Sequence, residues 1–173
     1  MNLTKFKEKR IRNSFNKKLS QLKAQTIDSQ RIMQSVGILT TDTISSKLDV
    51  LKELETILGV RNAKMYSFRK FDKIDEKSFK HFSEKDINWK GEFVQDNFQS
   101  FLEQPFDLLI GYFNTNHLYL ECAVLQSKAH FKVGFSHVNS ELYQIEISDN
   151  LDDIQSFFTE LKKYLIILKK LKN

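Results

Sequence analysis

The chain has 173 residues, the length of one ordinary domain, with 40% hydrophobic and 28% charged residues and a net charge of +5. This composition excludes an intrinsically disordered chain, because enough apolar side chains are present to build a core. Five Gly and one Pro are too few for the many turns of a β-sandwich or barrel, so an α/β fold with long elements is expected.

Cysteine usage and hydropathy indicate where the chain resides. The single cysteine, Cys122, excludes an intramolecular disulfide and the usual cysteine-based metal sites. No window holds 18 consecutive apolar residues, and residues 1–18 carry Lys and Arg throughout, unlike a secretory signal. We therefore expect a cytoplasmic protein without a membrane span.

Positive charge is concentrated at the N-terminus. Residues 1–25 hold eight Lys and Arg residues and one acid, Glu8, so the rest of the chain is slightly acidic. Four apolar residues in this segment recur at the spacing of one helix face: Ile11, Phe15, Leu19 and Leu22. The segment 1–25 is therefore predicted to form a basic amphipathic helix, over residues 4–25, attached to a single α/β domain of residues 26–173.

Beyond residue 30, short apolar runs alternate with helical periodicities, which is typical of a parallel sheet with helices on its faces. Strands are expected at 35–40, 63–68, 106–113, 131–135 and 143–147, the last one near an edge. Helices are expected at 44–58, 97–104, 117–128 and from about 151 onward. Residues 71–90 are predicted to be a polar excursion across the surface. The predicted fold class is a three-layer, Rossmann-like, mostly parallel sheet with helices on both faces.

Three single residues give local predictions. Gly59 is expected to end its helix as a C-terminal cap. Pro105 is expected to stop the helix before it, because the residue preceding a proline is pushed out of the helical region. Cys122 is expected on the buried side of its helix.

Polar residues directly follow several predicted strands. Ligands of open parallel sheets bind beyond the carboxyl ends of the strands, so these residues form a candidate ligand rim: Thr41, Asp42, Asn114, Asn116, His117 and His137. Hydroxyl groups and helix N–H groups there would bind a sugar or phosphate, and His117 or His137 would transfer protons. The alternative is that these residues are helix caps and loop residues, which use the same residue types.

Motifs of the common enzyme classes are absent from the sequence. The turn after the first predicted strand lacks the glycines of a dinucleotide-binding fingerprint, and the chain has no Walker loop, zinc-protease motif or hydrolase elbow. Its four histidines do not show the spacing of metal ligands. We therefore expect no cofactor, no metal and no catalytic residue, and we expect a protein that is not an enzyme.

The basic segment suggests a binding function. Its candidate contact residues are Lys5, Lys9, Arg10, Arg12, Lys17 and Lys18. Together with Phe6 and Phe15, they could neutralise the phosphates of RNA, for instance on the ribosome, or bind an acidic protein partner or an anionic membrane surface. The competing interpretation is a solvated face of a packed helix.

Three segments carry a resemblance to known proteins: QPFDLLI at 104–110, SKAHFKVGF at 127–135 and ELKKYL at 160–165. They resemble a family of uncharacterised flavobacterial-type proteins of similar length. The resemblance covers almost the whole chain. It implies a compact cytoplasmic protein and supplies no catalytic residues.

A second resemblance concerns the order of three strands, at 36–39, 106–112 and 132–135. This order is similar to the N-terminal half of heptosyltransferase-like glycosyltransferases and implies a Rossmann-like fold. Those enzymes bind the nucleotide-sugar mainly in a second half for which 173 residues leave no room. The alternative function is therefore a reduced glycosyltransferase-like domain that binds a nucleotide or sugar phosphate at the rim.

Overall fold

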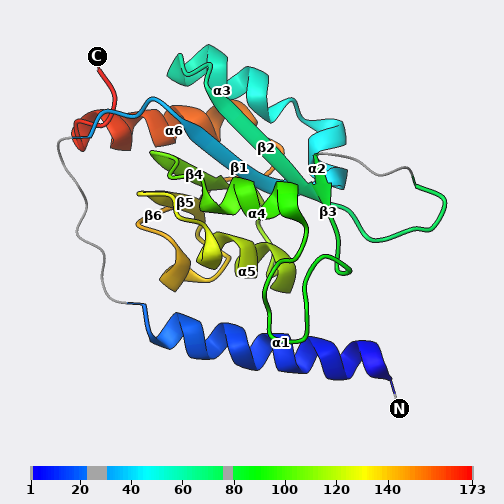
Figure 1. Ribbon diagram of the computed structural model, residues 1–173. Coiled ribbons are helices and arrows are strands. Elements are labelled where there is room, and N and C mark those ends of the chain that lie inside the picture. The colour runs from blue at the N-terminus through cyan, green and yellow to red at the C-terminus, as the bar shows by residue number, and fades with distance from the viewer. Residues whose placement is uncertain (1, 23–30, 76–79, 173) are drawn as a thin grey trace.

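The computed structural model of the chain describes residues 2–22, 31–75 and 80–172 (Figure 1). Its helices are α1 (Leu3–Ser20), α2 (Asp42–Lys47), α3 (Val50–Leu58), α4 (Asp96–Glu103), α5 (Leu118–Gln126), the 3₁₀ turn η1 (Ser140–Leu142) and α6 (Ile154–Ile167). Its strands are β1 (Val36–Thr41), β2 (Ala63–Phe68), β3 (His81–Phe82), β4 (Leu108–Gly111), β5 (Lys132–Phe135) and β6 (Ile145–Ile147).

The six strands form one open sheet in the order β3-β2-β1-β4-β5-β6, and every neighbouring pair is parallel. The register aligns Val36 of β1 with Ala63 of β2 and with Leu108 of β4. Strands β2 and β3 extend the sheet on one side of β1, and β4, β5 and β6 extend it on the other side. This is the strand order of a doubly wound Rossmann sheet. The fold class is therefore α/β and Rossmann-like, as the sequence predicts.

Helices cover both faces of the sheet and create three layers (Figure 1). Helices α3 and α6 pack against each other on one face, and α5 packs over β1 and β4 on the other. Aromatic side chains fill both interfaces: Phe82, Phe98 and Phe106 are buried near α4, while Tyr112 and Phe157 contact each other near α6. The central strands are buried on both sides, which explains their continuous apolar sequence.

Helix α1 lies outside these layers, against α5 (Figure 1). It begins at Leu3, where the Asn2 side chain caps the N–H groups of Thr4 and Lys5, and it ends at Ser20. The helix predicted over residues 4–25 is thus shorter at its C-terminal end. Leu22, predicted on the apolar face, follows the helix and is exposed, and residues 23–25 lie outside the described ranges.

The single helix predicted over residues 44–58 is wrong, because the structure has two helices there. Leu48 adopts an extended conformation, with φ −123° and ψ 127°, and ends α2. The Asp49 side chain then accepts a hydrogen bond from the Lys52 N–H and starts α3. The predicted cap is confirmed at the other end, where Gly59 ends α3 in the left-handed region at φ 71°.

Residues 71–90 are not only a surface excursion, which corrects the sequence-based prediction. This segment contributes the edge strand β3, whose Phe82 is buried and pairs in register with Phe68 of β2. A second difference concerns Tyr143, predicted in the last strand. It follows the 3₁₀ turn instead, with a buried side chain, and only residues 145–147 form the edge strand β6.

Two further local predictions are confirmed. Helix α4 ends at Glu103, and Gln104, which precedes Pro105, is extended. Cys122 lies on the buried side of α5 and is 2% exposed. None of the helices in the described ranges combines the length and the hydropathy that a membrane crossing requires.

Candidate functional site

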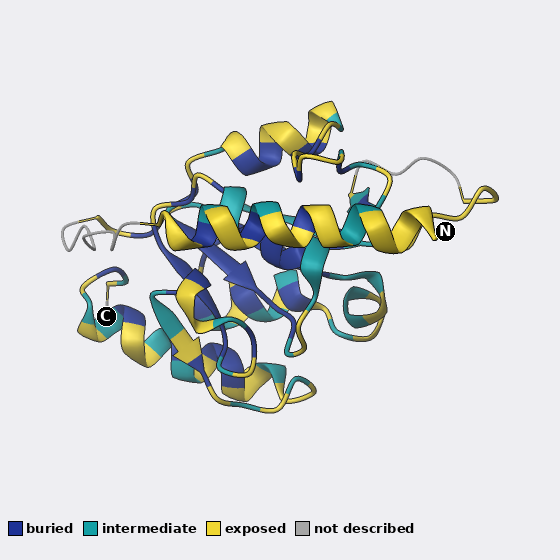
Figure 2. Cartoon of the chain, turned by 90° about the horizontal axis from the view of Figure 1, so that it is seen from below, coloured by how far each residue is buried: buried dark blue, intermediate teal, exposed yellow. Residues whose placement is uncertain are grey.

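Five cations cover the outward surface of α1. Lys5, Lys9, Arg10, Arg12 and Lys17 are all exposed to solvent, and we call these five residues the cationic face. Figure 2 shows α1 lying across the molecule with most of its surface exposed. Lys18, the sixth residue predicted to bind a partner, is only partly exposed, and its charge reaches the Cys122 thiol of α5.

The opposite side of α1 fixes the helix to the protein. Ile11, Phe15 and Leu19 are buried in the core, at the four-residue spacing that the sequence predicts. Burying side chains of this size stabilises the packed helix by about 1.5–3 kcal/mol for each residue. The cationic face is therefore presented by a docked helix.

The one acid of α1 faces inward. Glu8 accepts a hydrogen bond of 3.2 Å from the hydroxyl of Tyr119 in α5. Burial raises the pKa of Tyr119, and the neighbouring Glu8 carboxylate raises it further, so the phenol stays protonated and donates. The solvent side of α1 consequently has cations without an acid among them.

The body pairs with this charge only weakly: Arg12 lies close enough to the Glu121 carboxylate of α5 to favour its ionised form, without a direct ion pair. The five residues of the cationic face form no ion pair with any residue in 2–22, 31–75 or 80–172. Their charges remain available to a partner. Lys7, on the side of the helix, differs from them, because its ammonium donates to the Glu84 carbonyl at 3.2 Å and burial lowers its pKa.

An aromatic pair lies at the N-terminal end of α1. Phe6 and Trp89 have ring centroids 5.9 Å apart, and both remain well exposed, at 48% and 40%. The helical pattern of the sequence points to Phe6 but not to Trp89, because nothing in a single sequence brings residues 6 and 89 together.

The predicted ligand rim lies at one edge of the sheet. Thr41 is the last residue of β1 and Asp42 follows it. The other four residues come after later strands: Asn114, Asn116 and His117 after β4, and His137 after β5. The carboxyl ends of parallel strands share one edge, so the topology places all six residues there.

Two rim residues are used as helix caps. Thr41 accepts a hydrogen bond from the Ile44 N–H at the start of α2, and His117 Nδ1 accepts one of 3.2 Å from the Leu120 N–H at the start of α5. Burial lowers the pKa of His117, which favours the neutral ring needed for this bond. Tyr112 directly follows β4 at the same end of the sheet. Its ring is buried, and its hydroxyl donates to the Leu151 carbonyl at 2.7 Å.

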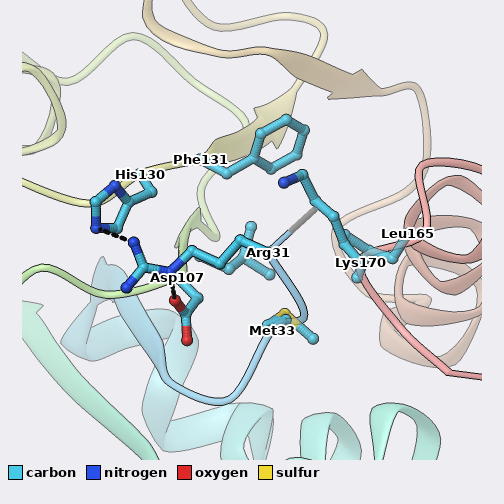
Figure 3. Close-up of a pocket in the computed structure, with 8 residues that line it drawn as sticks. Arg31, Met33, Asp107, His130, Phe131, Leu165 and Lys170 are labelled. Atoms are coloured by element: carbon cyan, nitrogen blue, oxygen red, sulfur yellow. Dashed lines mark hydrogen bonds and ion pairs between the residues drawn. The ribbon is translucent and has the colours of Figure 1, made fainter. Parts of the chain in front are cut away.

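A small hollow lies at the opposite edge of the sheet, before the strands begin (Figure 3). Arg31 Nε is 2.6 Å from Asp107 Oδ1, and Arg31 Nη1 donates to His130 Nε2 at 2.7 Å. Asp107 Oδ2 accepts from the backbone N–H groups of Gln34 and Ser35. The hollow has room to enclose about one water molecule, which is too little to enclose a sugar or a nucleotide.

The hollow has a structural role. Burial alone would raise the pKa of Asp107, but its hydrogen bonds to Gln34 and Ser35 and the Arg31 charge lower it overall. The ionised carboxylate ties residues 31–35 to the start of β4. The ammonium of Lys170, 5.0 Å from the centre of the Phe131 ring, closes the other side.

Metal ligands are not grouped in the described part of the chain. Among residues 2–22, 31–75 and 80–172, no cluster of three or more His, Cys, Asp or Glu side chains is placed to hold a metal ion. Two of the six rim residues, Thr41 and His117, cap helices, and Arg31, Asp107 and His130 of the hollow bond to one another or to the backbone. The cationic face is the candidate site whose charges are open to a partner.

Comparison with known proteins identifies the family. No curated protein and no solved structure shows a significant match to the chain, so the similarity to heptosyltransferase-like enzymes stays a prediction. A family model described as a family of unknown function, DUF6913, matches residues 7–168. The match includes most of α1 and all six strands. The chain therefore belongs to the DUF6913 family.

Proposed function

We propose that this protein is a non-enzymatic RNA-binding protein that contacts RNA through the cationic face of α1. The observation that carries the proposal is the group of five exposed cations that no described acid pairs, on a helix whose one acid points inward. Such a surface attracts a polyanion, because each cation that meets a phosphate releases a bound counterion.

A membrane surface fits this helix less well. An interfacial helix inserts its apolar side between lipid headgroups. In α1 that side, formed by Ile11, Phe15 and Leu19, is already buried against the body. Exposed apolar side chains remain only near the two ends of the helix, at Leu3, Phe6 and Leu22, and the stretch between them offers a partner a polar and cationic surface.

An acidic protein also fits less well. Protein interfaces are centred on apolar or aromatic anchors that become fully buried. Between residues 9 and 17 the outward side of α1 has only cations and amides, Asn13 and Asn16. These groups suit phosphate and sugar oxygens, which account for most hydrogen bonds between proteins and nucleic acids.

The first test is what the tagged protein carries when it is purified at low salt. The proposal predicts copurifying nucleic acid that ribonuclease removes and deoxyribonuclease leaves. A variant with Lys5, Lys9, Arg10, Arg12 and Lys17 all changed to Glu should lose it. The proposal would be wrong if the wild-type protein carried an acidic protein and no nucleic acid, and if the same variant failed to carry it. The partner of the cationic face would then be a protein.

A further inference from the structure

Trp89 sits at the tip of a tight turn formed by residues 88–92. Asn88 holds this turn, because its side-chain oxygen accepts from the N–H groups of Lys90 and Glu92, and its own N–H donates to the Glu92 carbonyl. The turn requires Gly91, whose φ of 81° lies in the left-handed region. Trp89 is therefore presented on an ordered tip.

The same turn is fastened to two helices. Ser14 of α1 donates to the Lys90 carbonyl at 2.8 Å, and Gln126 of α5 donates to the Gly91 carbonyl at 2.7 Å. A Cβ at Gly91 would lie 3.3 Å from the Ser14 oxygen, so glycine also allows the close approach. These contacts fix the position of Trp89 relative to α1.

The aromatic pair continues into a polar row along α1. Phe6, Arg10, Asn13 and Lys17 follow one another at intervals of four, three and four residues, which places them on one side of the helix. Arg10 and Lys17 are seven residues apart, or about 10 Å along the axis. The two exposed rings, Phe6 and Trp89, therefore lie at one end of a row that carries the cations Arg10 and Lys17.

From this arrangement we propose that the surface binds single-stranded RNA, with unpaired bases stacking on Phe6 and Trp89 while Arg10 and Lys17 contact the phosphates. The inference rests on the proposed function and names its substrate class. Bases inside a duplex have no free faces for such rings, whereas proteins that bind single strands combine a cationic track with aromatic platforms. The fixed turn reduces the ordering needed on binding.

The exposure of both rings supports this assignment. Phe6 and Trp89 lie outside the main buried cluster, so the core does not require large aromatic residues at these positions. The ring planes are inclined by 55° to each other, and both side chains remain exposed to solvent. A carboxylate in the same turn, Glu92, is held by the Asn88 amide at 3.0 Å.

The test uses Trp89, the only tryptophan of the chain, as the reporter. The full-length protein is titrated with a 12-nucleotide uridine strand and with an RNA duplex of the same length. Trp89 emission is followed together with the anisotropy of labelled RNA. We expect the single strand to quench Trp89 and the duplex to bind without comparable quenching.

Three variants complete the design. Trp89→Leu and Phe6→Leu should each weaken single-strand binding about tenfold, the effect of losing one stacked base, and leave duplex binding unchanged. The matched control is Tyr164→Leu, which removes a ring that is 39% exposed on α6 and should change neither affinity. Thermal melting checks that each variant is folded.

Each outcome separates the two proposals. If both RNAs bind without quenching, and the leucine variants bind as the wild type does, stacking is refuted and the RNA-binding function stands. If neither RNA binds at low salt, the proposed function fails and the inference with it. If anionic lipid vesicles quench Trp89 and the uridine strand does not, the aromatic pair is a lipid contact and the inference is overturned.

Discussion

Tyr143 packs directly on Gly134. Gly134 of β5 and its cross-strand neighbour Gly111 of β4 leave a patch of the sheet surface without side chains, and the Tyr143 ring packs on this patch. A Cβ on either glycine would overlap the ring, whose atoms are buried on all sides. This contact fixes η1 against the centre of the sheet.

The first prediction concerns the contact between Gly134 and the Tyr143 ring. Gly134→Ala should destabilise the fold by about 1–3 kcal/mol, because the added methyl must displace a packed ring. Urea denaturation of both proteins measures the difference. Gly59→Ala is the control for backbone strain alone, since Gly59 has φ 71° and an added Cβ would meet nothing within 4 Å, so it should cost about 1 kcal/mol. A change below about 0.5 kcal/mol for Gly134→Ala would contradict the contact.

The second prediction concerns the Tyr143 hydroxyl. Within the described residues this buried oxygen has no hydrogen-bond partner. Tyr143→Phe removes an unsatisfied polar group and keeps the ring, so the free energy of unfolding should stay the same or rise by up to about 1 kcal/mol. A loss of more than about 1 kcal/mol in the same urea experiment would indicate a hydrogen bond that the structure lacks.

The third prediction is a pH dependence at Asp107. Its hydrogen bonds and Arg31 lower the pKa in the folded protein, so the stabilisation is present above the unfolded pKa of about 3.9 and is lost as pH falls through the lower folded value. Asp107→Asn should therefore cost about 1–3 kcal/mol at neutral pH. The difference should shrink below about pH 4.

The measurement for Asp107 is urea denaturation from about pH 3 to about pH 7, with Asp152→Asn as the control. Asp152 is exposed, and its substitution should change stability little at any of these pH values. A difference between wild type and Asp107→Asn that stays constant below about pH 4 would show that the ionised carboxylate is not the source of the stabilisation.

The fourth prediction concerns Cys122. Burial raises the pKa of its thiol to about 12, and the neighbouring Glu121 adds to the shift. The reactive thiolate is then scarce and inaccessible, so a thiol reagent should modify the native protein far more slowly than the urea-unfolded protein. Equal rates in the two states would place Cys122 at the surface.

The sequence predicts the central sheet well, for a physical reason. Strands buried on both faces, such as β4, must be apolar at every position, and a helix such as α4 must end before Pro105. The break at Leu48 could not be predicted from periodicity, because Leu48 fits the apolar pattern and the Asp49 cap decides the boundary. The two-residue strand β3 exists only through its pairing with β2.

The candidate site was predictable only in part. The cations of α1 and their apolar anchor follow from spacing within one helix. The contact of Phe6 with Trp89 and that of Arg31 with Asp107 join distant parts of the chain, and neither leaves a periodic signal. The inward position of Glu8 likewise depends on Tyr119, a residue of another helix.

The central claim, that the cationic face of α1 binds RNA, is tested most directly by the salt dependence of affinity. Wild type is compared by fluorescence anisotropy with the variant that has Lys5, Lys9, Arg10, Arg12 and Lys17 changed to Glu. A control of equal net charge has five exposed lysines of the body changed to Glu: Lys47, Lys52, Lys128, Lys163 and Lys172. Circular dichroism checks that all three are folded.

If all five cations contact phosphates, the logarithm of affinity should fall against the logarithm of salt with a slope of about −4.5 for a duplex and about −3.5 for single-stranded RNA, and a single strand held by Arg10 and Lys17 alone would give about −1.4. The α1 variant should lose binding, because its reversed side chains repel phosphates while Ile11, Phe15 and Leu19 still hold the helix. The control should keep a similar slope and much of the affinity. Equal binding by wild type and the α1 variant, or no binding by wild type at low salt, would contradict the account.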